Sequence, residues 1–273
     1  FFVKESKMKE KIILRKGSVI GKQHLNAGRN NQDHAAVNNE NFLGVLCDGC
    51  SSGKNSEIAS FLISEFLVNR ITRYIRNGET PVWAVQASYQ DVLIEVFDTI
   101  IKMIEPVNPV EFVFSALRAT VMGVLHLKEL NKTIIFYQGD GKYYIDGEVF
   151  NIDQNNAPTY MVYELPQVVN KLGHIEGLGA FNIVVVNSNW KRVAISSDGV
   201  PDFVFSEIWG DEHKASLQRQ LNVFSDRKVF SDDATIIAIE RYGDFEEELE
   251  NSEELENEQV YAELFSVASV LSL

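Results

Sequence analysis

Cysteine is scarce in this chain, and the sequence has neither a long apolar run nor an excess of basic residues. Two cysteines among 273 residues cannot build a disulfide framework, which predicts an intracellular, cytoplasmic protein with reduced thiols. No apolar run is long enough to span a bilayer, and the charged start is unlike the apolar segment of a signal peptide. A formal net charge of −14 without a basic stripe argues against nucleic-acid binding. We therefore expect no membrane and no nucleic-acid partner.

The negative charge is concentrated near the C-terminus. The stretch Asp244–Glu263 holds ten acidic residues and no lysine or arginine, so the remainder of the chain is close to neutral. Such a run predicts a solvated helix or a disordered tail, although it could also occupy a binding cleft or bind a basic partner. We divide the chain into an N-terminal extension (1–10), one domain (11–241) and an acidic tail with an apolar end (242–273).

Hydrophobic periodicity predicts strands and helices in separate blocks. The first block has strands at Lys11–Ile20, His34–Val37 and Phe42–Cys47, then helices at Asn55–Ile75 and Pro81–Ile104. The second block has strands at Thr120–Leu127, Thr133–Gln138, Lys142–Ile145, Glu148–Ile152, Tyr160–Leu165, Phe181–Val186 and Arg192–Ser196, helices at Pro201–Glu207 and Glu212–Leu221, and a last strand at Ala234–Ile239. This order predicts an α+β fold with antiparallel sheets and helical layers, because a doubly wound parallel sheet would alternate strand and helix.

Aspartates recur at the edges of the predicted strands. They are Asp33, Asp48, Asp140, Asp198 and the pair Asp232-Asp233. Carboxylates gathered at one rim of a sheet repel one another unless cations lie between them, and all-oxygen ligand sets suit Mg²⁺ or Mn²⁺. The alternative is that single Asp-Gly pairs only make turns, as we expect for Asp146-Gly147. Spacing alone leaves open whether these acids converge.

At these residues the sequence resembles the protein phosphatase 2C family over roughly residues 15–240. The matching segments, in the family's order, are Asn31-Gln32-Asp33, Gly44-Val45-Leu46-Cys47-Asp48-Gly49, Ala119-Thr120, Gly139-Asp140-Gly141-Lys142, Ile195–Asp202 and Asp232-Asp233-Ala234-Thr235. The resemblance implies a sandwich of two antiparallel sheets flanked by helices, with metals in a cleft at one end. Where the sequence departs from the family's best-known members, it resembles a divergent bacterial branch of the family.

The resemblance also implies a set of metal ligands. Asp48 would bridge two ions, Mg²⁺ or Mn²⁺, and the carbonyl of Gly49 would bind one of them. Asp198 and Asp232 would complete the coordination of the second ion. Asp140 would serve a more loosely held third ion together with Asp198.

Two further residues are implied to take part in catalysis. Asp33 would hold metal-bound water, and Arg29 would bind the phosphate. Arg29 lies one residue closer to the Asp than is usual in the family; it remains the candidate for binding phosphate, and the alternative of a surface arginine with a differently directed side chain is equally consistent. Cys50 stands where eukaryotic members carry a histidine, and Gly141-Lys142 replaces a Ser-Arg pair.

The function implied is that of a serine/threonine phosphatase acting on a phosphoprotein, opposing a cognate kinase in signal transduction. The alternative is a weak or inactive relative that binds a phosphoprotein or regulatory partner. Cys47 and Cys50 also form a C-x-x-C pattern, but no other soft ligands stand nearby, so a redox or zinc role is disfavoured. The histidines, His24 among them, show no ligand spacing and are expected to be ordinary surface or core residues.

Overall fold

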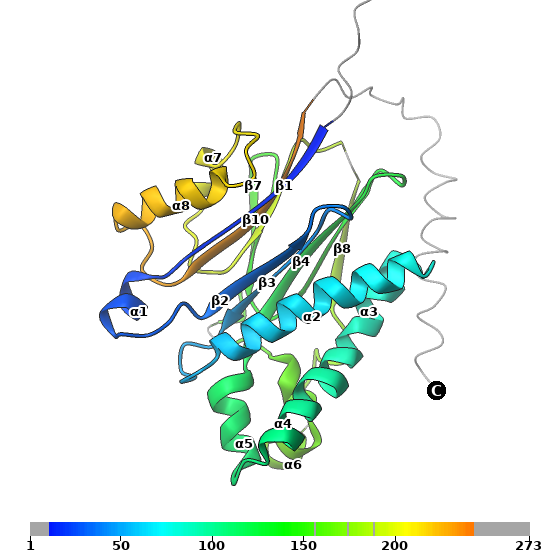
Figure 1. Ribbon diagram of the computed structural model, residues 1–273, viewed down its shortest axis with the longest axis vertical. Coiled ribbons are helices and arrows are strands. Elements are labelled where there is room, and N and C mark those ends of the chain that lie inside the picture. The colour runs from blue at the N-terminus through cyan, green and yellow to red at the C-terminus, as the bar shows by residue number, and fades with distance from the viewer. Residues whose placement is uncertain (1–10, 156, 174, 188, 243–273) are drawn as a thin grey trace, which may run out of the picture.

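The computed structural model describes residues 11–155, 157–173, 175–187 and 189–242, so the predictions for the N-terminal extension and the acidic tail lie outside the described residues. The described part contains two five-stranded antiparallel sheets, packed face to face with helices outside them (Figure 1). Their strand orders are β1-β10-β9-β6-β7 and β2-β3-β4-β5-β8. The expected α+β sandwich is therefore confirmed.

The strands are β1 (Lys11–Val19), β2 (Asp33–Asn38), β3 (Leu43–Gly49), β4 (Ala119–Leu127), β5 (Lys132–Gln138), β6 (Gly141–Ile145), β7 (Glu148–Ile152), β8 (Asn182–Asn187), β9 (Arg192–Ser196) and β10 (Ala234–Tyr242). The α-helices are α1 (Lys22–Asn26), α2 (Glu57–Arg76), α3 (Pro81–Asp91), α4 (Thr99–Ile104), α5 (Pro109–Phe112), α6 (Pro166–Leu172), α7 (Val204–Glu207) and α8 (Ser216–Asp226). Two π-helical segments, η1 (Val92–Asp98) and η2 (Val113–Leu117), and a 3-10 helix, η3 (Met161–Glu164), complete the set.

Alternation along each strand divides the apolar side chains between three cores. In β3, Val45 and Cys47 belong to the core beneath α2 and α3, whereas Leu46 belongs to the core between the sheets. In β10, Ile237 faces the inter-sheet core and Ile236 the core beneath α7 and α8. Because successive strand residues point to opposite faces, the same alternation determines toward which face of the sheet the acids at the strand ends point.

The first strand of the domain, β1, pairs with its last strand, β10. β1 pairs with β10 in antiparallel register from Lys11 opposite Tyr242 to Val19 opposite Ala234. A buried ion pair links the two strands, because Arg15 Nη2 lies 2.7 Å from Glu240 Oε2. None of the helices within the described residues is long and apolar enough to cross a membrane.

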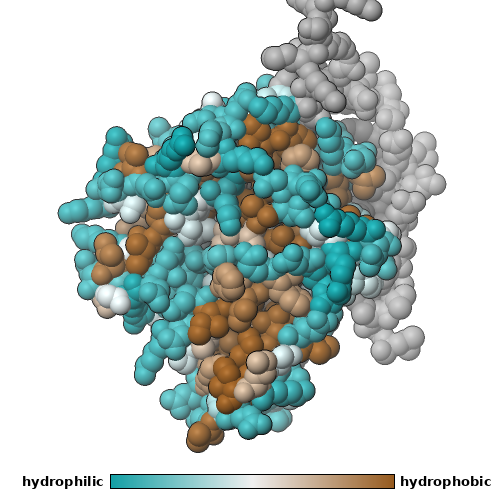
Figure 2. Space-filling view, viewed as in Figure 1, coloured by the Kyte–Doolittle hydropathy of each residue, from teal (hydrophilic) through white to brown (hydrophobic). Residues whose placement is uncertain are grey.

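Apolar side chains stay exposed at one end of the molecule, over α4 and α5 (Figure 2). Met103 and Ile104 of α4 and Val107, between the two helices, are more than half exposed. Isolated apolar residues are common on protein surfaces, but a grouped set indicates a contact surface.

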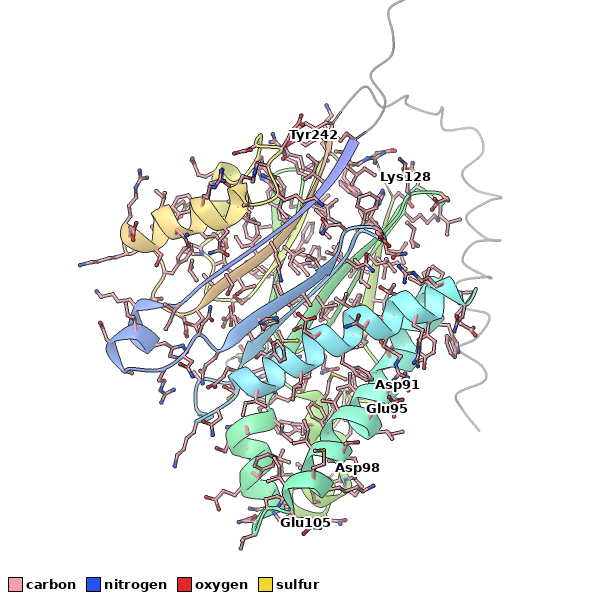
Figure 3. All side chains as sticks on the ribbon, in the orientation of Figure 1. Asp91, Glu95, Asp98, Glu105, Lys128 and Tyr242 are labelled. Atoms are coloured by element: carbon pink, nitrogen blue, oxygen red, sulfur yellow. The ribbon has the colours of Figure 1, made fainter. Side chains whose placement is uncertain are left out.

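The predicted helix Pro81–Ile104 forms as one helical segment made of α3, η1 and α4, with a π-helical middle. Its acids Asp91, Glu95 and Asp98 follow one another along this segment (Figure 3). Arg70 of α2 binds two of them, with Nη1 3.1 Å from Asp91 Oδ2 and a close contact to Glu95. This fixes the segment against α2.

One predicted strand is wrong. Tyr160–Leu165 contains the 3-10 helix η3, in which Met161 and Val162 are buried with Leu165 in the core beneath α2 and α3. Buried residues at these spacings suit a helical turn, and Pro166 begins α6 immediately afterwards. The short helices α1, α5 and α6 were not predicted.

Candidate active site

Two carboxylates stand opposite each other where β2 begins and β3 ends. Asp33 is paired with Asp48, and the next pair on the same face is Ala35 with Leu46, both in the inter-sheet core. The side chains of Asp33 and Asp48 therefore continue the inter-sheet row to the rim of the sandwich. The sheet register brings together two residues that the sequence placed only at separate strand ends.

Asp33 is nearly completely buried and only half satisfied. Its Oδ2 accepts a hydrogen bond of 2.8 Å from the hydroxyl of Ser197, whereas its Oδ1 is buried without a hydrogen-bond partner. Burial raises the pKa of Asp33 to about 7, with a further increase from Asp233 that the Ser197 hydrogen bond opposes. A buried carboxylate oxygen without a donor is costly, and it marks a position where a cation or a bound water would fit.

Three further acids are linked electrostatically to this rim: Asp48 and Asp140, which are half-buried, and Asp198, which is exposed. Burial raises the pKa of Asp48 well above its usual value, and the carboxylates of Asp33 and Asp198 raise it further. Burial also raises the pKa of Asp140 to about 6, with Asp198 as the next cause. The structure therefore brings these three acids and Asp33 into one electrostatically connected row, which we call the acid row.

The loop that carries Asp198 is held from β6. Lys142 Nζ lies 2.8 Å from both the Val200 carbonyl and Asp202 Oδ1. The sequence departure at Gly141-Lys142 thus supplies a cation that fastens this loop. A Cβ on Gly199 would lie 2.1 Å from the Asp233 carbonyl oxygen, so only glycine allows β9 and β10 to approach here.

Gly49 has a comparable packing role next to Asp48. It is buried, its N–H donates to the Gln32 carbonyl at 3.1 Å, and an added Cβ would lie 2.8 Å from that same oxygen. The close approach joins the end of β3 to the residue before Asp33. The predicted role of the Gly49 carbonyl as a metal ligand stays a prediction.

Asp232 lies at the other side of the rim, next to a cluster that sequence reasoning missed. Asp233 is buried and accepts from Gly21 N at 2.7 Å, from Gln32 N at 2.6 Å and from His24 Nδ1 at 2.8 Å. His24 Nδ1 is also 3.6 Å from Asp232 Oδ1. His24 is therefore a specifically bonded residue, although nothing in its sequence spacing indicates this.

The ligand atoms of His24, Asp232 and Asp233 lie within 4.8 Å of one another, close enough to share a cation. The contacts favour a structural role for Asp233, because three N–H donors already occupy its carboxylate oxygens. Through these bonds Asp233 fastens both ends of the 21–32 segment to the start of β10. Asp232, with a side chain 44% exposed, keeps more freedom to bind an ion.

Arg29 lies outside the acid row. It is exposed, and its guanidinium donates to the carbonyl of Ser51, three residues beyond Asp48. Its phosphate-binding role stays a prediction. Cys47 and Cys50 are both free thiols, the first buried in the core beneath the helices and the second half-buried at the rim.

The donor set of the rim fits divalent cations. The acid row offers only carboxylate oxygens. After burial, Asp33 and Asp198 raise the pKa of Asp48, and Asp198 raises the pKa of Asp140, so ionised carboxylates here are unfavourable without a counterion. Mg²⁺ and Mn²⁺ prefer such hard oxygen ligands. The unpartnered Oδ1 of Asp33 adds a buried acceptor at the same place.

Comparisons with known proteins concern the family and the fold. The sequence model of the family described as protein phosphatase 2C matches residues 20–234. A comparison with curated protein sequences found no match. Among solved structures, a bacterial serine phosphatase is similar with a TM-score of 0.59 and 16% identity, covering 86% of this chain and 100% of that one.

Two further structures are similar. Serine/threonine phosphatase Stp1 from Staphylococcus aureus has a TM-score of 0.57 and 14% identity, covering 88% of this chain and 99% of that one. The catalytic domain of serine/threonine protein phosphatase PstP, in complex with two manganese ions, has a TM-score of 0.53 and 15% identity, covering 85% and 99%. At these identities the likeness concerns the fold.

Proposed function

The chain belongs to the protein phosphatase 2C family of divalent-metal-dependent phosphatases, and from this premise we propose that it hydrolyses phosphoserine and phosphothreonine in proteins using two bound Mg²⁺ or Mn²⁺ ions. The observation that carries the proposal is the acid row, which begins at the buried, half-satisfied Asp33 and continues through Asp48 to Asp198. Carboxylates that repel one another, together with a buried carboxylate oxygen that lacks a hydrogen-bond partner, are features expected of a cation site.

The proposed ligands follow from their positions in the row. Asp48 lies between Asp33 and Asp198 and would be shared by two ions, with the Gly49 carbonyl on one and Asp198 and Asp232 on the other. Asp140, next to Asp198, would hold a third ion more loosely. Two divalent ions would supply an acidified water and would neutralise charge on the phosphoryl oxygens.

The chain's own groups have two tasks in this proposal. Asp33, fixed through Oδ2 by Ser197, offers Oδ1 as the acceptor for a proton of the attacking water. A pKa near 7 suits a group that accepts and returns a proton at neutral pH. Arg29 would leave the Ser51 carbonyl to bind phosphoryl oxygens, and it needs only a side-chain rearrangement because it is exposed.

A second candidate function is a weak or inactive phosphatase fold that binds a phosphoprotein. The observation that favours it is Arg29, which bonds the Ser51 carbonyl and lies outside the acid row. The biological setting that we propose is the cytoplasm, in signal transduction, with a cognate serine/threonine kinase making the substrate.

Hydrolysis of a phosphothreonine peptide separates the two candidates. We expect Mn²⁺-dependent turnover by the wild-type protein and its loss in Asp198→Ala, because that residue closes the acid row on the solvent side. Calorimetry must first confirm that the wild-type protein binds Mn²⁺. A wild-type protein that binds Mn²⁺ yet hydrolyses nothing would support the binding function instead.

A further inference from the structure

An open pocket of about 540 Å³ includes the segment that follows Asp48 and β3 in its wall. Ser52 and Lys54, from the segment after β3, form one wall, and residues 107–118, which include α5 and η2, form the other. Figure 1 shows α5 next to the beginning of α2, at the end of the sandwich where β3 ends and β4 begins. None of the proposed metal ligands lines it.

Backbone contacts connect the pocket directly to the catalytic rim. In the β3–β4 register Asp48 stands opposite Thr120 and Gly49 opposite Ala119. The next residue, Cys50, donates its N–H to the carbonyl of Arg118 at 3.1 Å. Arg118 is thus two residues from the partner of Asp48, and an extended peptide covers about 3.3 Å per residue. A residue next to a bound phosphoresidue would reach the pocket.

The positive charge at the pocket is held in place. Arg118 donates from Nη2 to Ser52 Oγ at 2.8 Å and from Nε to the Phe114 carbonyl at 2.9 Å, and its guanidinium lies 4.9 Å from the centre of the Phe114 ring. Lys54 adds a second cation and Glu111 one acid. The pocket is therefore net cationic, in a chain whose formal net charge is −14.

The floor of the pocket is apolar. Phe112 and Phe114 are half-buried, and Val107 is fully exposed at the edge. The apolar surface over α4 and α5 continues outward from it (Figure 2). An occupant that suits this pocket has an apolar side chain for the floor and a negative charge for the rim, because both surfaces are otherwise left to water.

On the basis of the proposed function, we propose that this pocket binds the substrate polypeptide beside the phosphoresidue, with an apolar side chain against Phe112 and Phe114 and an acidic group at Arg118 and Lys54. The bonds of Arg118 to Ser52 and Phe114 preorganise it, which reduces the entropic cost of binding. The pocket selects among phosphoproteins, and the acid row performs the reaction on any of them.

Two phosphothreonine peptides and one small substrate test the pocket. One peptide carries phenylalanine and glutamate beside the phosphoresidue, and the other carries glycine and serine there. The small substrate is p-nitrophenyl phosphate, which cannot reach the pocket. We expect the wild-type protein, loaded with Mn²⁺, to favour the first peptide by about tenfold in kcat/KM, mainly through KM, which corresponds to one well-buried apolar contact.

Val107→Asp and Arg118→Gln should each reduce this preference to about twofold, because the first places a repelling carboxylate at the edge of the pocket and the second removes the charge of Arg118. Met103→Asp is the matched control, since Met103 is also largely exposed, on α4, but does not line the pocket. It should keep the wild-type preference and the wild-type rate on p-nitrophenyl phosphate. Val107 is fully exposed, so its replacement tests the pocket even if Arg118→Gln proves unstable.

Equal hydrolysis of both peptides by the wild-type protein would overturn the inference, as would an unchanged preference in Val107→Asp. The same loss of preference in Met103→Asp would also overturn it, because the effect would then not come from the pocket. These results differ from failure of the proposed function, in which the Mn²⁺-loaded wild-type protein would not hydrolyse p-nitrophenyl phosphate or either peptide.

Discussion

The hydroxyl of Ser197 donates a hydrogen bond of 2.8 Å to Asp33 across the two sheets. Ser197 follows β9 in one sheet and Asp33 begins β2 in the other, so this bond orients the most buried carboxylate of the acid row from the opposite layer. Ser197 Oγ also accepts from Thr235 N at 3.0 Å, which fixes the hydroxyl. The relative position of the two sheets therefore determines the hydrogen bonding of Asp33, and with it the pKa of its carboxyl group.

Replacing Ser197 by alanine should move the pH profile of the phosphatase. The hydrogen bond from Ser197 lowers the pKa of Asp33, so its loss raises that pKa. The acidic limb of metal-dependent turnover should shift to higher pH by about 0.5–1 unit, since one hydrogen bond contributes roughly 1 kcal/mol. Ser206→Ala is the control, because Ser206 is exposed and its hydroxyl bonds the nearby Phe203 carbonyl. An acidic limb that stays in place would mean that Ser197 does not act through Asp33.

The metal-free protein should lose stability as pH rises from about 4 to about 7. The folded-state pKa of Asp33 is about 7 and its ordinary value is 3.8, so the folded state binds the extra proton within this window. Stability linked to that proton is fully present below pH 4 and is lost as pH passes through 7. Urea unfolding in EDTA should show a loss on the order of 4 kcal/mol from this group.

Asp33→Asn provides the comparison for this measurement, because an amide cannot ionise. The variant should show a flatter dependence on pH than the wild-type protein, and excess Mn²⁺ should remove most of the wild-type dependence by stabilising the ionised carboxylates. If the two metal-free proteins gave parallel pH curves, Asp33 would not be the group that titrates.

Metal binding should depend on Asp48 and Asp198. Each is linked to another acid of the row, so Asp48→Asn or Asp198→Asn would remove an oxygen ligand from the proposed two-ion site. We expect Mn²⁺ affinity to fall by at least about tenfold, and Mn²⁺ at a fixed concentration to raise the unfolding temperature less than in the wild-type protein. Asp226→Asn, on the exposed end of α8, should behave as wild type in calorimetry. If both rim variants bound Mn²⁺ with wild-type affinity, the metal site would have to lie elsewhere in the protein.

The buried ion pair of Arg15 and Glu240 should contribute strongly to stability. Their side chains are 0% and 4% exposed, and Arg15→Met leaves the Glu240 charge buried with fewer donors. We expect a loss of about 3 kcal/mol in the free energy of unfolding. Arg76→Met is the matched control, because Arg76 and Glu40 are 60% and 80% exposed, and it should cost less than about 0.5 kcal/mol. Equal effects in chemical denaturation would contradict the difference in burial.

Much of the fold could be predicted from the sequence, because strand alternation and turn residues are local signals. The strand Arg192–Ser196 was predicted with its actual ends. Tyr160–Leu165 was wrong because a short apolar run suits both a strand and a buried helical turn, and only tertiary packing decides between them. The short helices α1 and α6 have too few residues for a periodic pattern.

The candidate site could be predicted only in part. Resemblance to the family pointed to each acid at a strand end, but the pairing of Asp33 with Asp48 depends on sheet register, which no local pattern specifies. His24 was missed because its partner, Asp233, is 209 residues away in the sequence. Arg118 was missed for a related reason, since its proximity to Asp48 follows from the β3–β4 pairing.

The pairing of β1 with β10 has a consequence for how the protein is made on the ribosome. Val19 leaves the ribosome long before its partner Ala234 exists, and at about 5–20 residues per second the wait is roughly ten to forty seconds. During that time β1 has an unpaired edge, and such long-range pairing is slow. The same last strand follows Asp232, so the nascent chain acquires the full set of proposed metal ligands only at the end of domain synthesis. A prematurely terminated product therefore could not assemble the proposed catalytic centre.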